Sequence, residues 1–198
     1  MGEIVIVKKP DSVSFEDIHE LLYQAHQVNR DNGFTIGTGL MSGEQLQEHL
    51  GENSVCFVAM DGDKVVGTTS NRVRHYRHWC AEGDVVERVM TGVLPEYKGR
   101  HIYEKLNQAA VQDARERGVR YLEVRAADQN HTILKLNLRN GFKKIDFTTA
   151  GKDHYTVILL KWLDRCPYPD WFIKFRYELK RIYIKLRYKP GKIKRFGI

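Results

Sequence analysis

The chain has 198 residues, of which 42% are hydrophobic and 29% are charged. This balance is typical of one folded domain and argues against a disordered, collagen-like or coiled-coil chain. The longest apolar run, Tyr155 to Leu163, contains Lys161 and is much shorter than the roughly 18 residues of a membrane span. The net charge is +7, yet residues 163–198 alone carry +8. The positive charge therefore belongs to the C-terminal part of the chain.

The N-terminal residues and the cysteines indicate the same cellular compartment. The segment Met1 to Ile6 has no basic stretch followed by a long apolar one, and Ile6 stands where a myristoylation signal needs Ser or Thr. Cys56, Cys80 and Cys166 are odd in number and widely spaced, which is typical of reduced thiols. We therefore expect a cytoplasmic protein.

Hydrophobic spacing predicts strands and helices in alternation along most of the chain. Helices are expected where apolar residues recur every three or four positions behind a capping residue such as Ser14 or Ser42, and strands where β-rich runs lie between turn signals. The glycine-rich stretch 33–43 is expected to be a mobile loop. The predicted elements are, in chain order, a strand over 4–8, helices over 14–32 and 42–50, strands over 55–60, from 65 and over 85–93, a helix over 102–117, a strand over 121–126, a helix over 130–140, and strands over 142–147 and 155–160. This order predicts an α/β fold, a mixed sheet with helices on its faces.

A basic, glycine-containing turn joins the strand at Val93 to the following helix. The segment reads Val93-Leu94-Pro95-Glu96-Tyr97-Lys98-Gly99-Arg100-His101-Ile102-Tyr103. Such a turn directs backbone N–H groups outward at a helix N-terminus, where the helix dipole favours a phosphate. It resembles the pyrophosphate loop of the GNAT superfamily of acyl-coenzyme A N-acyltransferases, which reads Val-x-Pro-x-Tyr-Arg-Gly-x-Gly-Ile-Gly.

A second segment resembles the same family further along the chain. Asn130, Ile133, Asn137, Gly141 and Phe142 follow the spacing Asn-x-x-Ala-x-x-x-Tyr-x-x-x-Gly-Phe, with Ile133 in place of Ala and Asn137 in place of Tyr. The element order also matches the family from residue 3 to about residue 162. The resemblance implies a GNAT-like mixed central sheet flanked by helices, with an acyltransferase domain over residues 1–162 and a separate extension over residues 163–198.

The resemblance implies an acyl-coenzyme A dependent N-acyltransferase. Acetyl-coenzyme A is the expected donor, although another acyl-coenzyme A fits as co-substrate, and the acceptor is a small-molecule or protein amine. The alternative is a non-catalytic module that has the fold and uses its basic tail to bind a membrane or a partner. His101 and Tyr103 replace two family glycines and weigh toward this alternative, whereas the Asn130 spacing weighs toward the enzyme. The residues that the resemblance implies at the coenzyme are Thr91, Val93, Lys98, Gly99, Arg100, His101, Ile102, Tyr103, Asn130 and Asn137.

Two residues are predicted to carry the chemistry. Glu87 lies six residues before Val93, the spacing at which some family members place a carboxylate base, and an apolar strand end would raise its pKa. The alternative is a structural Glu87 paired with Arg88 or a tail cation. The family's Tyr acid is replaced by Asn137. Either Tyr155, Tyr103 or solvent reprotonates the thiolate, or the reaction proceeds without help because a coenzyme A thiolate is a good leaving group; Tyr155 is our prediction. In the family, backbone N–H groups around Thr91 to Val93 polarise the carbonyl, and Gly92 suits the bulge that exposes them.

The segment His75 to Cys80 contains residue types that bind zinc. His75, His78 and Cys80 are close in sequence, but no second cluster of ligands completes a site. We therefore predict no metal, and expect this segment to be a connection between strands that packs or contacts substrate.

The C-terminal extension is predicted to contain an amphipathic helix. Its apolar stripe is Phe172, Phe175, Leu179, Ile182, Tyr183 and Leu186, with Lys and Arg on the rest, and Pro190-Gly191 ends the pattern. The favoured partner of this stripe is the protein body or a second subunit in a homodimer. An anionic membrane at the inner surface ranks next, and nucleic acid last, because the body is slightly acidic and has no recognisable reader motif. An acidic acyl carrier protein could also be attracted to the basic face.

Overall fold

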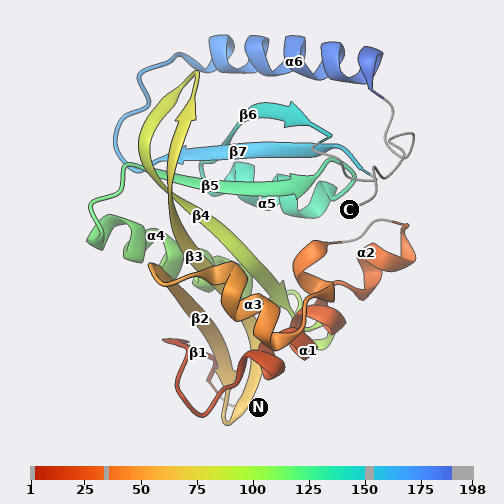
Figure 1. Ribbon diagram of the computed structural model, residues 1–198, viewed down its shortest axis with the longest axis vertical. Coiled ribbons are helices and arrows are strands. Elements are labelled where there is room, and N and C mark those ends of the chain that lie inside the picture. The colour runs from red at the N-terminus through yellow and green to blue at the C-terminus, as the bar shows by residue number, and fades with distance from the viewer. Residues whose placement is uncertain (1–2, 34–35, 150–153, 189–198) are drawn as a thin grey trace.

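The computed structural model describes residues 3–33, 36–149 and 154–188. Seven strands form one mixed sheet in the order β1-β2-β3-β4-β5-β7-β6 (Figure 1). Only β4 and β5 pair in parallel, and the other neighbours are antiparallel. The strands are β1 (Val5–Lys8), β2 (Ser54–Asp61), β3 (Lys64–His78), β4 (Ala81–Val93), β5 (Tyr121–Ala127), β6 (Lys143–Thr148) and β7 (Thr156–Trp162), and the helices are α1 (Phe15–Ala25), α2 (Gln27–Asp31), α3 (Gly43–Leu50), α4 (Ile102–Glu116), α5 (His131–Arg139) and α6 (Asp170–Arg187), with short 3-10 turns η1 (Gly37–Leu40) and η2 (Pro95–Tyr97).

The predicted order of strands and helices is confirmed, and the predicted helix caps are present. Ser14 and Ser42 each accept a hydrogen bond from the backbone three residues later and complete a capping box. The first helix is broken in two, because α1 ends at Ala25 and α2 begins at Gln27. The expected mobile loop contains η1, and residues 34–35 lie outside the described residues.

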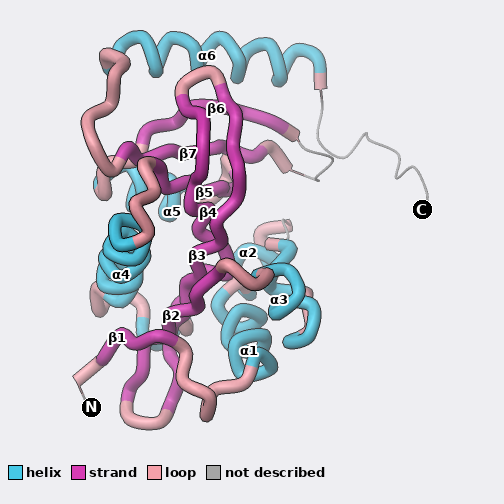
Figure 2. Tube along the Cα trace, turned by 60° about the vertical axis from the view of Figure 1, so that its left-hand side comes forward, coloured by secondary structure: helices cyan, strands magenta, loops and turns pink. Residues whose placement is uncertain are grey.

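Helices cover both faces of the N-terminal half of the sheet. α1 and α3 lie on one face of β2, β3 and β4, and α4 lies on the other (Figure 2). The contact between α1 and β4 is close: a Cβ on Gly92 would lie 3.0 Å from Ala25 and 3.1 Å from Leu22. Gly92 therefore lets α1 approach β4, which holds the end of that strand in place.

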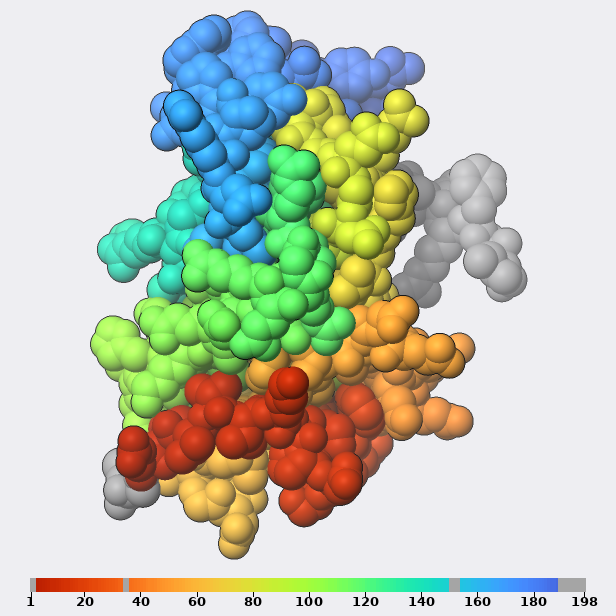
Figure 3. Space-filling view, turned by 90° about the vertical axis from the view of Figure 1, so that its left-hand side faces the viewer, coloured from red at the N-terminus to blue at the C-terminus, as the bar shows by residue number. Residues whose placement is uncertain are grey.

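The β3–β4 hairpin is longer than predicted. Residues 75–80 are no loose connection, because the two strands continue to His78 and from Ala81. The Trp79 ring at the tip contacts Tyr168 and Phe172, with centroid distances of 5.3 and 5.9 Å. The Trp79 indole N–H donates to the carbonyl of Ile145 in β6. Figure 3 shows this hairpin (yellow) beside the blue segment that leads from β7 into α6. Trp79 thus packs between β6 and the start of α6.

The C-terminal helix docks on the sheet, but through the opposite side from the one predicted. Ile173, Tyr177 and Ile184 are buried and belong to the cores that underlie β5, β6 and β7. The prediction that the stripe from Phe172 to Leu186 packs on the protein body was wrong, since all of its residues except the half-buried Phe172 are exposed. The helix is apolar on two opposite sides, and spacing alone did not distinguish the side that packs on the sheet. The end of the sequence pattern at Pro190-Gly191 lies outside the described residues.

Candidate active site

The carboxyl end of β4 separates from β5 and contains a bulge. The parallel pairing ends at Arg88 opposite Val124, while β4 continues to Val93. On the other side, the register with β3 shifts between Val89 and Gly92, and Met90 has a φ of 52°. The bulge is therefore at Met90 and Thr91 and not at Gly92, whose small size serves the contact with α1. Irregular backbone that parts two parallel strands at their carboxyl ends is a common ligand position in α/β sheets.

The predicted phosphate turn lies directly after this bulge. Gly99 has a φ of 80°, and a Cβ there would meet no atom within 4 Å, so the turn is open to solvent at this point. His101 is the N-cap of α4 in the left-handed conformation and makes no side-chain cap. The first N–H groups of α4 therefore have no intrahelical acceptor. These groups are available to an anionic ligand.

The side chains of the turn point in different directions. Lys98 and His101 are exposed, and the His101 ring lies 3.6 Å from Glu104. Arg100 lies 3.9 Å from Asp61 and stacks on Tyr97, toward the β2–β3 turn. Ile102 is buried, so only its backbone can face a ligand.

Tyr103 crosses from α4 to α5. Its hydroxyl donates to the Asn137 side-chain oxygen at 3.0 Å. Arg88 of β4 also donates to this oxygen, at 2.8 Å, and to the Tyr103 hydroxyl. The Asn137 amide nitrogen donates to the carbonyl of Ile133. The hydroxyl of a tyrosine on α4 thus contacts Asn137, the residue of α5 that stands where the family motif has a tyrosine.

The two predicted asparagines have structural contacts. Asn130 caps α5 by accepting from the N–H of Ile133 at 3.2 Å. Asn137 has no exposed surface, and both ends of its amide are hydrogen-bonded. The predicted coenzyme contact of Asn137 gains no support from this geometry, whereas its role in holding α5 to β4 and α4 is direct.

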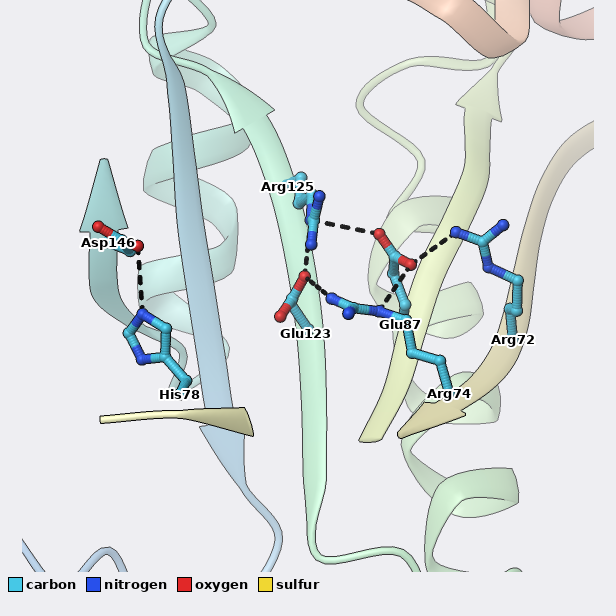
Figure 4. Close-up of polar contacts among 7 residues, drawn as sticks. All are labelled: Arg72, Arg74, His78, Glu87, Glu123, Arg125 and Asp146. Carbon is cyan, nitrogen blue, oxygen red and sulfur yellow. Dashed lines mark hydrogen bonds and ion pairs between the residues drawn. The ribbon is translucent and has the colours of Figure 1, made fainter. Parts of the chain in front are cut away.

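Glu87 lies at the centre of a charged cluster on β3, β4 and β5 (Figure 4). Its carboxylate is 2.7 Å from Arg72, 3.0 Å from Arg74 and 3.3 Å from Arg125. Glu123, opposite Glu87 on β5, is 2.7 Å from both Arg74 and Arg125. Three guanidinium groups therefore surround two buried carboxylates, and the cluster carries one net positive charge. In the described part of the chain, neither Arg88 nor a cation of the tail pairs with Glu87.

The pKa of Glu87 is lowered, contrary to the sequence-based expectation. Burial favours a higher pKa, but the hydrogen bond from Arg72 and the charges of Arg125 and Arg74 outweigh it. The sequence analysis missed these arginines. Arg72 and Arg74 alternate on β3, so both reach the same face of the sheet as Glu87, a pattern that becomes visible only when the strand pairing is known.

Tyr155 lies away from this cluster, just before β7. Its hydroxyl donates to the carbonyl of Tyr188 at 2.7 Å, and its ring packs against Phe147 with the two ring planes tilted by 30°. Lys185 of α6 lies over the same ring. Among the described residues, Tyr155 has no contact with Glu87 or Tyr103. Its catalytic role stays a prediction, and the contacts observed here join α6 to the sheet.

A half-buried histidine that the sequence analysis did not single out, His26, follows the last residue of α1. The His26 ring is close to Gly39 of η1. Burial lowers the pKa of His26 to about 4, and the charges of Arg30 and Lys98 act in the same direction. His26 is therefore neutral at pH 7 in the folded protein.

Acidification is expected to destabilise the protein through His26. A histidine with a folded pKa near 4 and an unfolded pKa near 6.5 binds its proton more readily when unfolded, so stability falls as the pH drops from about 6.5 to 4. Between pH 7 and pH 5 the loss amounts to about 2 kcal/mol. Urea unfolding of the native protein and of the His26→Gln variant at pH 7 and pH 5 measures this loss of unfolding free energy. Equal pH dependence of the two proteins would contradict the assignment.

The zinc-type residues of the hairpin form no metal site. His78 lies between Cys80, at 3.4 Å, and Asp146, at 3.2 Å. Burial raises the pKa of the Cys80 thiol to about 12, so this trio provides no thiolate nucleophile. In the part of the chain that the structure describes, no group of three or more His, Cys, Asp or Glu side chains is arranged to hold a metal.

Residues 15–142 match the acetyltransferase (GNAT) family. The chain belongs to this family. The predicted resemblance is thereby confirmed. No curated protein matches the chain significantly.

Solved GNAT structures share the fold at low sequence identity. A GNAT acetyltransferase from Staphylococcus aureus is 17% identical, with a TM-score of 0.63, covering 82% of this chain and all of its own. The ribosomal-protein-S18-alanine N-acetyltransferase of Escherichia coli is 15% identical, with a TM-score of 0.62 and coverages of 82% and 96%. The PaiA N-acetyltransferase of Thermoplasma acidophilum, solved with coenzyme A, is 16% identical, with a TM-score of 0.61 and coverages of 81% and 99%. About a fifth of this GNAT chain has no counterpart in them.

Proposed function

We propose that the protein transfers an acetyl group from acetyl-coenzyme A to the amine of a small molecule or a protein. The observation that carries the proposal is the β4 bulge at Met90 and Thr91, where β4 has separated from β5 and leads into the open start of α4. A thioester between the strands and a pyrophosphate on the helix start would fit this arrangement. The coenzyme A bound to the Thermoplasma relative supports the choice of donor.

The transfer needs a polarised carbonyl, a deprotonated amine and a proton for the departing thiolate. β4 still pairs with β3 at Gly92 and Val93 but no longer pairs with β5. Backbone N–H groups within Thr91 to Val93 that face the side of β5 would polarise the carbonyl. Glu87 would receive the proton of the amine through water, since its carboxylate is ionised throughout the neutral range. The amine nitrogen then bonds to the carbonyl carbon, the carbon–sulfur bond breaks, and the sulfur takes a proton from Tyr103.

Tyr103 is preferred to Tyr155 as the proton donor because of its place beside the bulge strand. Its hydroxyl lies against Arg88, two residues before Met90, whereas the Tyr155 hydroxyl is bound to the chain at Tyr188. Tyr103→Phe should lower kcat by about a hundredfold. Tyr155→Phe is the matched control and should leave kcat nearly unchanged. The assay records free thiol released from acetyl-coenzyme A with a panel of amines.

If Tyr155→Phe lowered kcat and Tyr103→Phe did not, Tyr155 would be the proton donor to the thiolate. The absence of thiol release by the native protein with every class of amine, together with intact coenzyme binding, would favour the non-catalytic alternative. The departures His101 and Tyr103 are the features that favour that alternative, because both put side chains where the family has glycine.

A further inference from the structure

α6 presents its most apolar side to the outside of the molecule. It lies along one end of the protein with one side on β6, and in both ribbon views no other described element lies beyond it (Figures 1 and 2). Leu186 is 83% exposed and Trp171 is 69% exposed. The outer face, as we call it, comprises the exposed or half-buried residues Trp171, Phe172, Phe175, Leu179, Ile182, Tyr183 and Leu186.

The outer face is continuous and uncharged. At 100° per residue, its seven side chains occupy one unbroken sector opposite Ile173, Tyr177 and Ile184, with no charged residue between them. Among the described residues, seven of the twelve large apolar side chains that are exposed belong to residues 171–188. Leaving such a face in water forfeits the free energy of its burial, so it is suited to a partner.

Cations flank the outer face on both sides. Lys174 and Arg181 border one edge and Arg176 and Arg187 the other, by the same helical geometry. Lys180 and Lys185 turn toward the sheet instead, 4.0 Å from Asp146 and 3.8 Å from Asp128. The only acidic residues of α6, Asp170 and Glu178, are paired with Lys143 and Arg181. After the helix, residues 189–198 add four Lys or Arg and no acidic residue. The partner should therefore be apolar at its centre and anionic at its rim.

We propose that α6 lies in the surface of an anionic lipid bilayer, with its outer face in the acyl boundary and its cations at the phosphates. Tryptophan, tyrosine and long basic side chains suit this depth, where one end of each is apolar and the other wet. No helix in the described ranges is long and apolar enough to span a membrane, so the contact would be with one leaflet. A second copy of α6 fits less well, because its flanking cations would repel those of the first. The proposal is independent of the acetyl transfer.

Vesicle sedimentation with the full chain tests the proposal. We expect binding to vesicles of equal parts phosphatidylglycerol and phosphatidylcholine, and little binding to phosphatidylcholine alone. Raising the salt should release the protein, because it screens the Lys and Arg charges. The variant Lys174→Gln should bind about fivefold more weakly.

Substitutions of exposed apolar residues distinguish binding through the outer face from nonspecific binding through other apolar surface residues. Phe175→Gln with Leu179→Gln should weaken binding by at least about tenfold and leave the melting temperature unchanged, because both side chains are exposed. Val28→Gln with Leu138→Gln, at similarly exposed positions of α2 and α5, is the matched control and should bind as the native protein does.

Tryptophan fluorescence reports how deeply α6 inserts into the vesicle surface. Trp171 fluorescence should shift to the blue on anionic vesicles, and Trp171→Phe should lose most of that shift. Three outcomes would overturn the proposal: no binding to anionic vesicles at low salt, undiminished binding by the Phe175/Leu179 variant, or a solution dimer that this variant dissociates. The last outcome would identify a second copy as the partner.

Discussion

Gly99→Asp is expected to weaken acetyl-coenzyme A binding by about a thousandfold. The position faces open space at the turn before α4, so the new carboxylate would extend toward the site proposed for the pyrophosphate. Two like charges about 4 Å apart near a protein surface repel by about 4 kcal/mol. Isothermal titration of the native and variant proteins with acetyl-coenzyme A measures the effect.

The control for this variant is Gly118→Asp. Gly118 also has a positive φ, of 67°, and also faces open space, but it lies at the opposite end of α4. Both substitutions strain the backbone similarly, by about 1 to 2 kcal/mol. Equal loss of binding in the two variants would show that strain, and not a charge beside the phosphates, is responsible.

Glu87→Gln should reduce both stability and turnover. Removing this carboxylate leaves Arg74 and Arg125 paired with Glu123 alone and takes away the carboxylate that Arg72 contacts. Because the arginines are partly exposed, we expect a loss of about 2 to 3 kcal/mol, somewhat below that of a fully buried pair. Turnover should fall by about a thousandfold if Glu87 accepts the amine's proton, while coenzyme affinity stays nearly unchanged. Chemical denaturation and the thiol-release assay measure the two effects.

A double variant separates the two roles of Glu87. Among the described residues Arg72 pairs with no carboxylate besides Glu87, so Glu87→Gln with Arg72→Gln restores the charge balance of the cluster. Stability should partly recover, whereas turnover should remain low. Recovery of turnover along with stability would reduce Glu87 to a structural residue.

The sequence predicted the local features of the fold well, and long-range packing less well. Ser14 and Ser42 act within a few residues, and their caps are present as expected. The partners of Glu87 depend on how β3, β4 and β5 align, a relation that no local spacing contains. The docking face of α6 was predicted wrongly for a similar reason: apolar spacing on both sides of the helix was compatible with either orientation, and the shape of the sheet selects Ile173, Tyr177 and Ile184.

The candidate site shows the same division between local and long-range features. The turn from Lys98 to Tyr103 is a contiguous segment, and the open helix start it predicts is present. The bulge was placed at Gly92 because glycine suits irregular backbone, but the close approach of α1 explains that glycine, and Met90 takes the positive φ. The Tyr103–Asn137 hydrogen bond joins two departures from the family pattern that are 34 residues apart, and the sequence alone did not link them.

The most direct test of the acetyltransferase account is the titration of the native 198-residue chain with acetyl-coenzyme A. The account predicts saturable binding of one equivalent with a Kd on the order of micromolar to tens of micromolar, and a higher melting temperature in the presence of the ligand. Absence of binding at millimolar acetyl-coenzyme A would contradict it, because the bulge of β4 and the start of α4 would then hold no donor.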